Sequence, residues 1–285
     1  MPAPEWWLSV FITTMGAGSV GGGAIMIWLL GLQLWHIVNG TPWNGTAHLQ
    51  RAMQGSSSVA PLPTLQLRRA PVTLAHLIAL RNTLDLNNTF DAAMFSAATV
   101  AFWCQCQLGE VCVDSLFDPT IHASCATQQK MGWTLSNIRF HYFWAPSMKT
   151  SPHGEEIRWT DSCCSCSTEW AFQNHWTVNL HVPATKHLFA FKMDTGNYAP
   201  MCRSWFLDRC NEVWSGKGLS MLSGHSFRIG GTTHLLLLGI NPFIVMVQGC
   251  WRSSAFLDYW RLCEEIITTF VGFSLMSQTS LLNPL

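Results

Sequence analysis

The sequence predicts a mainly helical protein of the α+β class with one small antiparallel β-sheet. Apolar residues recur at helical spacing along most of the chain, as over 22–38, 90–110 and 224–270. Apolar and polar residues alternate instead over 137–144 and 156–160, and prolines and a glycine lie between these two segments. Strands are therefore a minority that pair in one hairpin, and helices supply most of the core.

The composition indicates a chain with a large core and little surface charge. Of its 285 residues, 48% are hydrophobic and only 11% are charged, whereas about 25% charged is typical of soluble domains. The formal net charge is zero, so any contact with DNA must use local basic residues. Eleven cysteines without a regular framework indicate free thiols in a reducing compartment. The first residues lack a signal-peptide pattern, and we expect an intracellular protein.

A segment rich in serine and proline, "GSSSVAPLPTLQLRRAP", divides the chain. It predicts a small helical domain over 1–54, a linker over 55–72 and a larger domain over 73–285. Within the small domain, we expect three helices, over 6–14, 22–38 and 43–54.

The segment 21–38 raises the alternative of a small membrane protein. It is strongly apolar, and no Asp, Glu, Lys or Arg occurs between Glu5 and Arg51. However, Gln33 and His36 interrupt its end, and its flanks lack the positive charge that usually orients a span. We therefore expect no membrane contact and a helix with one buried face, formed by Ile25, Trp28, Leu29, Leu32 and Trp35.

The larger domain is expected to begin with a helix capped by Thr73. The segment 90–110 follows and is apolar on nearly all sides, which is typical of a central core helix. Beyond the two strands, the remaining helices are expected over 163–181, over 200–215 and over 224–270, the last broken at 239–242 and near Gly249.

Four residues near the end of the chain form the strongest chemical pattern. His225 and Arg228 are three positions apart and share one helical face. Trp251 and Tyr259 follow, and Tyr259 is one of only three tyrosines in the chain. A lone HxxR pair is usually structural, and Tyr259 alone could be the polar edge of an apolar helical stripe. The ordered set is more specific than any member, and we expect its side chains to meet on one concave face.

This set resembles the HxxR box and the following catalytic residues of the tyrosine recombinases, DNA breaking and rejoining enzymes that include phage-type integrases. "TTHLLLLGIN" and "QGCW" are similar to the family's segments between that box and the nucleophile. "WLLGLQLWHIVNGTPWNG" and the segment from "VTLAHLIALRNTL" to "CQCQLGE" resemble recombinases of fungal Crypton-like transposons. The resemblance runs from about Ser9 to about Ser274. It implies a recombinase catalytic core preceded by a shortened core-binding domain.

The resemblance also implies partners and surroundings. Double-stranded DNA is the expected substrate, bound by a homo-oligomer that forms a tetrameric synapse, in the nucleus and without a cofactor. Arg68, Arg69 and Arg252 are the expected DNA-binding residues outside the catalytic set. No metal is expected, because Cys163, Cys166 and His175 lack a further ligand at regular spacing.

Each catalytic residue has an implied role. Tyr259 would form a covalent 3′-phosphotyrosyl link, which stores the bond energy for rejoining. Arg228 would donate two parallel hydrogen bonds to phosphate oxygens, and His225 and the indole of Trp251 would add further donors. Lys149, in the connection between the two strands, would protonate the leaving 5′-hydroxyl. The alternative for Lys149 is an exposed lysine of a turn.

The chain departs from the family at the first box, where the family has an arginine followed three positions later by an acid. In "CQLGEV", Glu110 is in place but Gln107 occupies the arginine position. Glutamine donates neutral N–H groups and brings no charge, and loss of one transition-state donor costs about 10²- to 10³-fold in rate. We therefore expect a transposon-derived copy with impaired catalysis. The alternative is a catalytically inactive DNA-binding protein with the same fold.

Overall fold

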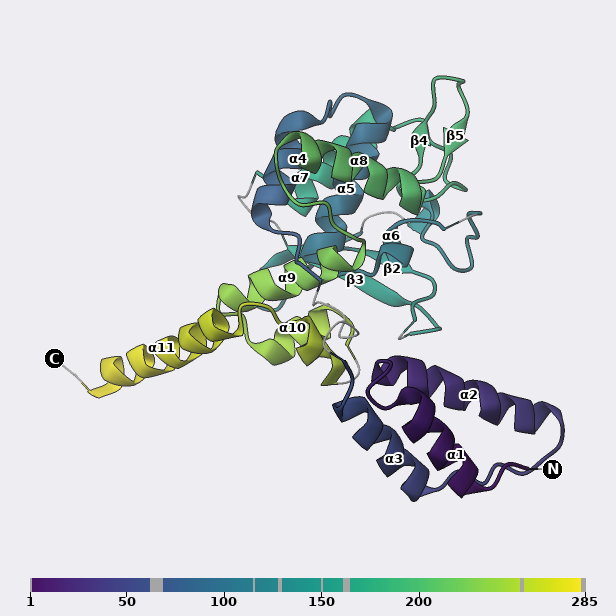
Figure 1. Cartoon of the computed structure of the whole chain (residues 1–285). Helices are drawn as coiled ribbons and strands as arrows, with labels where there is room; N and C mark the ends of the chain where they lie inside the picture. The colour runs from purple at the N-terminus through teal and green to yellow at the C-terminus, as the bar shows by residue number, and fades with distance from the viewer. Residues whose placement is uncertain are drawn as a thin grey trace. The chain divides into compact units, whose positions relative to one another are not determined.

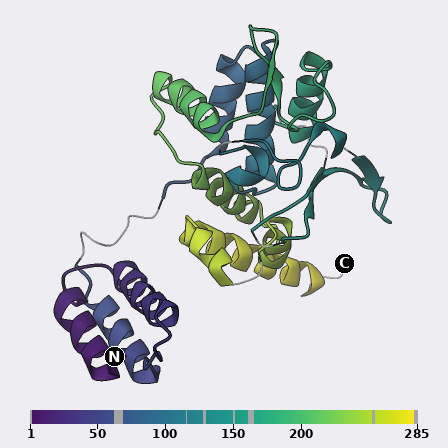
Figure 2. The same cartoon turned by 90° about the vertical axis from the view of Figure 1, so that its right-hand side faces the viewer.

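The computed structural model divides into two compact units, 1–68 and 69–285 (Figure 1, Figure 2). Both consist mainly of helices, and unit 2 also holds small antiparallel sheets, so the predicted fold class is confirmed. The structure describes residues 2–61, 69–114, 116–127, 130–149, 151–160, 165–251 and 254–282.

The described residues of unit 1 form three helices and one π-helical turn. A small core of Leu8, Ile12, Ile25, Leu29 and Leu49 holds them together. The third helix runs four residues further than expected, into the predicted linker. The elements are α1 (Glu5–Phe11), the turn η1 (Ile12–Gly16), α2 (Gly22–Val38) and α3 (Ala47–Ser58).

The expected buried face of α2 is correct in its first half and wrong at its end. Ile25 and Leu29 are buried, but the side chain of Trp35 is 51% exposed. His36 is buried instead, because its Nε2 accepts a hydrogen bond from the Ala3 N–H at 3.0 Å and its Nδ1 lies 2.8 Å from the Leu32 carbonyl oxygen. Within the described part of the chain, α2 included, no helix is both long and apolar enough to cross a membrane.

The core of unit 2 surrounds α5 (Thr89–Trp103), whose residues from Asp91 to Phe102 are all buried. The helices α4 (Leu74–Thr83), α7 (Thr168–Val178) and α8 (Arg203–Gly216) belong to the same unit. One partly buried ion pair ties α8 to α5, because Arg209 donates to both carboxylate oxygens of Asp91 at 3.1 and 3.0 Å. These contacts make α5 the central helix that the sequence predicts.

The prediction of one helix over 90–110 is wrong in its last part. The helix ends at Trp103, and Gln105 takes a left-handed backbone conformation with φ of 55°. A short helix, α6 (Leu108–Val111), then begins after Gln107, whose N–H donates to the Glu110 carboxylate at 2.9 Å. The positive φ of Gln105 cannot continue a helix, and this break separates Gln107 from α5.

The sheet of unit 2 has three antiparallel strands in the order β1 (Lys130–Trp133), β2 (Arg139–Ala145) and β3 (Glu155–Thr160). The hairpin of β2 and β3 agrees with the predicted alternation, while β1 was not predicted. Phe143 and Ile157 are paired across the hairpin, and both side chains are buried in the core of unit 2. A second sheet pairs β4 (Phe191–Lys192) with β5 (Tyr198–Ala199).

The last part of the chain carries the residues of the strongest sequence pattern. It contains α9 (His225–Leu237), α10 (Pro242–Gln248), the 3₁₀ helix η4 (Ser254–Tyr259) and α11 (Cys263–Leu282). Two glycines let α9 lie against neighbouring backbone. A Cβ atom at Gly230 would overlap the carbonyl oxygen of Val72, and one at Gly231 would overlap that of Phe102. This close packing fixes the first turns of α9 against the end of α5.

Candidate active site

The first turn of α9 positions His225 and Arg228. Every residue from Ser226 to Thr233 is buried, so this part of the helix has little freedom to shift. The two side chains lie on one face, as their spacing predicts, and reach different depths. His225 is partly buried, whereas Arg228 is 2% exposed.

His225 and Tyr259 form the most direct contact of the site. The Nε2 atom of His225 lies 2.7 Å from the hydroxyl oxygen of Tyr259. The pKa of His225 is lowered, first by burial and then by the positive charges of Arg69, Arg228, Arg203 and Lys149. The imidazole is therefore neutral at pH 7, and a neutral Nε2 can accept the phenolic proton of Tyr259.

Trp251 joins Arg228 to Tyr259. Its indole lies over the guanidinium of Arg228, with 3.8 Å from the Arg228 Cζ to the ring centroid. It also meets the ring of Tyr259 edge-on, with 4.2 Å between the two centroids. A left-handed residue, Cys250 with φ of 54°, turns the chain after α10, and the indole then packs over Gly249, where a Cβ atom would lie 2.5 Å from the Trp251 Nε1. The four residues of the pattern are thus brought together.

The guanidinium of Arg228 is largely occupied by backbone. Its Nη1 donates to the carbonyl oxygen of Gln105 at 2.6 Å, and its Nη2 donates to that of Gly249 at 2.7 Å. Arg228 Nε and Trp251 Nε1 are buried and lack a hydrogen-bond partner within the described ranges. Because an unpaired buried donor is costly, two donors beside Tyr259 are left for an anion.

Glu110 balances part of the buried positive charge. Burial raises its pKa to about 7, although the charge of Arg228 and the hydrogen bond from the Gln107 N–H act in the opposite direction. Its Oε1 is buried and has no hydrogen-bond partner in the part of the chain that is described. Glu110 therefore changes its charge near neutral pH, at a position that affects Arg228.

Gln107 and the expected lysine lie at the edge of this arrangement. Gln107 is partly exposed and forms a capping box with Glu110 at the start of α6. Across the described residues, no hydrogen bond links its side chain to His225, Arg228 or Tyr259. Lys149 is exposed in the connection between β2 and β3, and its charge contributes to lowering the pKa of His225.

The other expected residues differ in outcome. Arg69 is exposed at the start of unit 2, whereas Arg68 and Arg252 lie outside the described residues. Cys163, one of the three weighed as metal ligands, also lies outside them. His175 is buried with its Nε2 3.0 Å from the Leu188 carbonyl oxygen, and burial lowers its pKa to about 4. Within the ranges described, no group of three potential ligands could hold a metal ion.

Sequence reasoning missed two residues of the site. Gln105 is fully buried, and its side chain donates to the Val245 carbonyl oxygen at 3.2 Å and accepts from the Thr232 hydroxyl at 2.8 Å. A glutamine inside a long apolar run is a signal that could have found it. Arg203 begins α8 and contributes to lowering the pKa of His225. No local motif marks Arg203 in the sequence.

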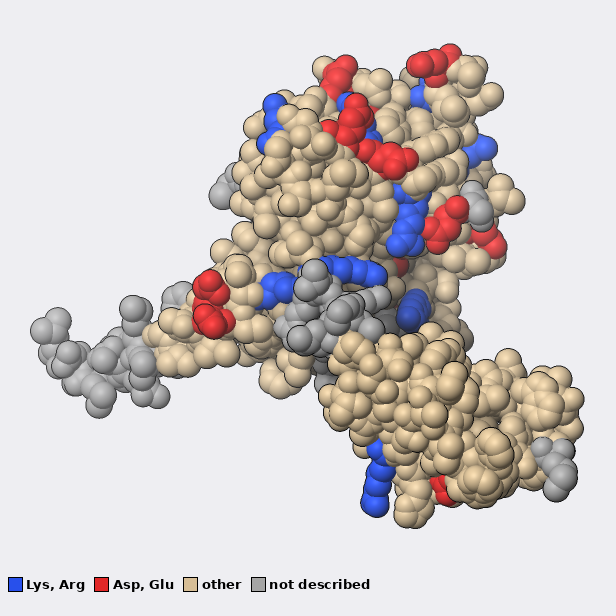
Figure 3. Space-filling model, in the orientation of Figure 1, with Lys and Arg blue, Asp and Glu red and all other residues tan. Residues whose placement is uncertain are grey.

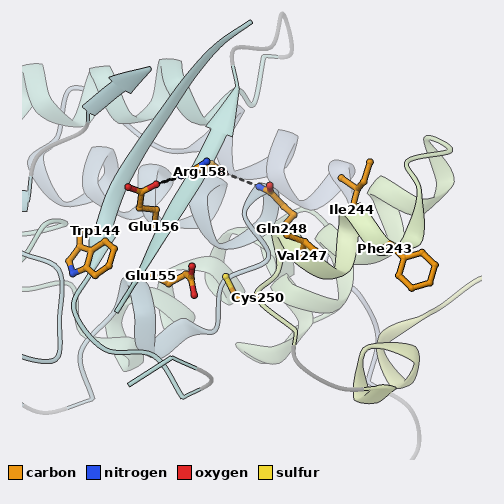
Figure 4. Close-up of a pocket in the computed structure, with 9 residues that line it drawn as sticks. All are labelled: Trp144, Glu155, Glu156, Arg158, Phe243, Ile244, Val247, Gln248 and Cys250. Atoms are coloured by element: carbon orange, nitrogen blue, oxygen red, sulfur yellow. Dashed lines mark hydrogen bonds and ion pairs between the residues drawn. The ribbon is translucent and has the colours of Figure 1, made fainter. Parts of the chain in front are cut away.

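A groove of 740 Å³ lies beside the site, between the β2–β3 hairpin and α10 (Figure 4). Gln248 lines the groove, and its Nε2 donates to the Arg158 carbonyl oxygen at 2.8 Å. Arg158 is already paired with Glu156, and Glu155 adds a second carboxylate to the lining. Because these carboxylates repel phosphate, we exclude the groove from the candidate active site.

The fold is that of the tyrosine recombinases and integrases. The chain is similar to the XerH site-specific recombinase bound to palindromic difH substrate in a post-cleavage complex, at 12% identity over 98% of this chain and 72% of that chain, with a TM-score of 0.56. It is also similar to the Tn1549 transposon integrase in complex with a circular intermediate DNA, at 13% identity over 90% of this chain and 81% of that chain, with a TM-score of 0.52. No protein-family model and no curated protein matches the chain.

Proposed function

We propose that the protein breaks and rejoins double-stranded DNA with Tyr259 as the nucleophile. One observation carries the proposal: the Tyr259 hydroxyl lies 2.7 Å from the His225 Nε2 and beside the stacked side chains of Trp251 and Arg228. A nucleophile, a base within hydrogen-bond reach and a cation are the parts that such a reaction needs. The fold supports the same conclusion, because the similar recombinase and integrase structures hold DNA.

In the cleavage step, the Tyr259 oxygen attacks a phosphorus atom of the DNA backbone. A new phosphorus–oxygen bond forms the 3′-phosphotyrosyl link, the bond from phosphorus to the 5′-oxygen breaks, and the phenolic proton passes to His225 Nε2. Lys149 gives a proton to the leaving 5′-oxygen. Rejoining reverses these steps, and the phosphodiester is restored without an external energy source because the covalent link conserves the bond energy.

Arg228 stabilises the negative charge that develops on the nonbridging oxygens. A guanidinium has five N–H donors, and two of those on Arg228 are directed to carbonyl oxygens. Because Trp251 covers the guanidinium and Arg228 is only 2% exposed, the indole has to move before a phosphate reaches the remaining donors. DNA binding and the opening of Trp251 are therefore coupled in this proposal.

Gln107 lowers the rate in this proposal, because it supplies no positive charge. The wider setting rests on the resemblance of the sequence alone. In this proposal, the protein is a copy derived from a fungal Crypton-like transposon. It acts in the nucleus as a homo-oligomer on DNA, and Arg68, Arg69 and Arg252 are among its phosphate contacts. No cofactor or metal takes part.

The burial of Arg228 favours a second candidate function. A guanidinium whose Nη atoms both donate to backbone carbonyl oxygens has a structural role without any substrate. If this structural role is the only role of Arg228, the protein has the recombinase fold and binds DNA but does not cut it. The two candidates differ in one product, a covalent bond between Tyr259 and DNA.

The test uses a pool of nicked duplexes of random sequence, in which a cleaved strand diffuses away and traps the covalent intermediate. We expect an adduct that survives denaturing electrophoresis with the parent protein and none with Tyr259→Phe. Tyr198→Phe is the matched control, because Tyr198 lies in β5 and the same hydroxyl is removed there. Duplex binding without an adduct would support the second candidate. If the protein neither binds the duplex nor forms an adduct, both candidate functions are contradicted.

A further inference from the structure

The start of α8 is tied to the end of α6, the helix that Gln107 precedes. Val113 lies two residues beyond α6, and its N–H donates to the Met201 carbonyl oxygen at 3.0 Å. The carbonyl oxygen of Val113 accepts from the Arg203 N–H at 2.9 Å. This short parallel bridge fixes the backbone of Arg203 beside the segment in which the expected first arginine is missing.

The side chain of Arg203 extends toward the start of α9. A Cβ atom built on Gly224, the residue before His225, would lie 3.5 Å from Arg203 Nη2 and 2.5 Å from Leu108 Cδ1. The guanidinium of Arg203 and the side chain of Leu108, the residue after Gln107, therefore both lie beside Gly224. Arg203 thus places a positive charge next to His225, close to the start of α6.

This positive charge is available for an anion. Within the described residues, the only acidic partner of Arg203 is Asp114, at 3.5 Å, and the two side chains are 42% and 70% exposed. Such a surface pair contributes little, about 0–1 kcal/mol. The other described arginine of α8 that pairs with acids is Arg209, which is held by Asp91 and Glu212 at 3.0 and 2.8 Å. Arg209 therefore has a structural role in holding α8, whereas the charge of Arg203 is left for another contact.

The surroundings of His225 are positively charged as a whole. Burial is the main cause that lowers the pKa of His225, and Arg69, Arg228, Arg203 and Lys149 add to it. Figure 3 shows Lys and Arg side chains of unit 2 gathered over the region where Figure 1 draws α6 and α9. Of these cations, Arg203 is the one whose backbone is bonded to the segment that follows α6.

We propose that Arg203 contacts the phosphate that Tyr259 attacks and supplies, from α8, the positive charge that Gln107 lacks. The inference rests on the proposed function, because it assigns a contact in the same reaction. A planar guanidinium can donate two parallel hydrogen bonds to phosphate oxygens, which a glutamine amide cannot do with a full charge. The contribution of Gln107→Arg should then depend on whether Arg203 is present.

The test measures the rate of adduct formation on nicked duplex for the parent and five variants, which include Gln107→Arg alone. Arg203→Gln should lower the rate by about a hundredfold, the lower range for one lost donor, and Arg203→Lys should recover part of it. Lys217→Gln is the matched control, because Lys217 follows the other end of α8, is exposed and loses the same charge. Gln107→Arg in the Arg203→Gln background should restore at least tenfold, and more than it adds to the parent. Equal rates for Arg203→Gln and Lys217→Gln would overturn the inference.

A second measurement separates this inference from the proposed cleavage. If neither the parent nor Gln107→Arg forms an adduct, cleavage is refuted, and the salt dependence of duplex binding decides the role of Arg203. The slope of log affinity against log salt should fall by about 0.9 with Arg203→Gln, the value for one phosphate contact, and stay unchanged with Lys217→Gln. Equal slopes, or no duplex binding by the parent, would overturn the contact. Thermal unfolding of each variant confirms that the folded state is compared.

Discussion

Unit 1 and unit 2 bury their apolar side chains to very different degrees. Unit 1 buries five apolar side chains in its core and leaves many large ones exposed, among them Trp6, Ile27 and Val38 at 62%, 67% and 76%. Unit 2 encloses α5 from Asp91 to Phe102 and holds a buried arginine in place. A buried cation needs a rigid surrounding to hold its partners, and only unit 2 provides one in the described residues.

The two units also differ in charge. The only charged residues in 1–68 are Glu5, Arg51 and Arg68. Phosphate contacts dominate the affinity of proteins for DNA, and they require cations. Most of the proposed DNA contacts therefore belong to unit 2, where Arg69, Arg203 and Lys149 all influence His225. The exposed apolar surface of unit 1 is the kind that takes part in contacts with other surfaces.

The largest expected difference concerns one glycine in each unit. Gly231→Ala should destabilise unit 2 by more than about 3 kcal/mol, because the new Cβ atom overlaps a backbone oxygen that cannot move aside. Gly31→Ala in α2 should stabilise unit 1 by up to about 1 kcal/mol, because its Cβ atom meets nothing within 4 Å. Urea denaturation with hydrogen exchange, which reads each unit separately, measures both. Similar losses at the two sites would show that the packing of α9 is looser than described.

The next effect concerns the pH dependence of unit 2. The folded-state pKa of Glu110 is raised to about 7 from 4.5, so the folded protein binds the proton more tightly than the unfolded chain. Stability should fall as the pH rises from about 4.5 to about 7, by an amount on the order of 3 kcal/mol. Glu110→Gln should remove this loss, and Glu264→Gln, at an exposed position in the first turn of α11, should leave it. An unchanged slope in Glu110→Gln would show that Glu110 is ionised throughout the folded state.

The smallest effect belongs to unit 1. The pKa of Glu5 is lowered, first by its hydrogen bond from the Thr46 hydroxyl and then by the Thr46 N–H. A lowered folded-state pKa gives stability that is present above the unfolded value of 4.5 and is lost as the pH falls through the folded value. Unit 1 should therefore lose stability below about pH 4.5, and Glu5→Gln should weaken that dependence. Hydrogen exchange of α3 at several pH values measures it, and identical profiles for both proteins would refute it.

Much of the fold follows from sequence patterns because the patterns are local. The helix over 22–38 and the two strands after 137 agree with α2, β2 and β3, since periodicity and turn residues act over short distances. The sequence did not predict the break at Gln105, because a glutamine gives no indication of a left-handed backbone conformation. β1 was missed because Lys-Met-Gly-Trp has little strand character until β2 pairs with it.

The candidate site was predictable only where its residues lie close together in the sequence. His225, Arg228, Trp251 and Tyr259 fall within one segment, and the structure brings them together. Gln105 and Arg203 come to the site from separate parts of the chain. Their positions depend on tertiary contacts such as the bridge at Val113. The cover that Trp251 forms over Arg228 also depends on the turn at Cys250, which no motif encodes.

The most direct test of the central claim is to locate the covalent bond itself. The protein is reacted with the nicked duplexes, the DNA is digested to a short remnant, and peptide mass spectrometry locates the added nucleotide. The account predicts the nucleotide on Tyr259 through a 3′-phosphate, in the parent and in larger amount in Gln107→Arg. A nucleotide on Tyr142 or Tyr198, or none in either protein although the duplex is bound, would contradict it.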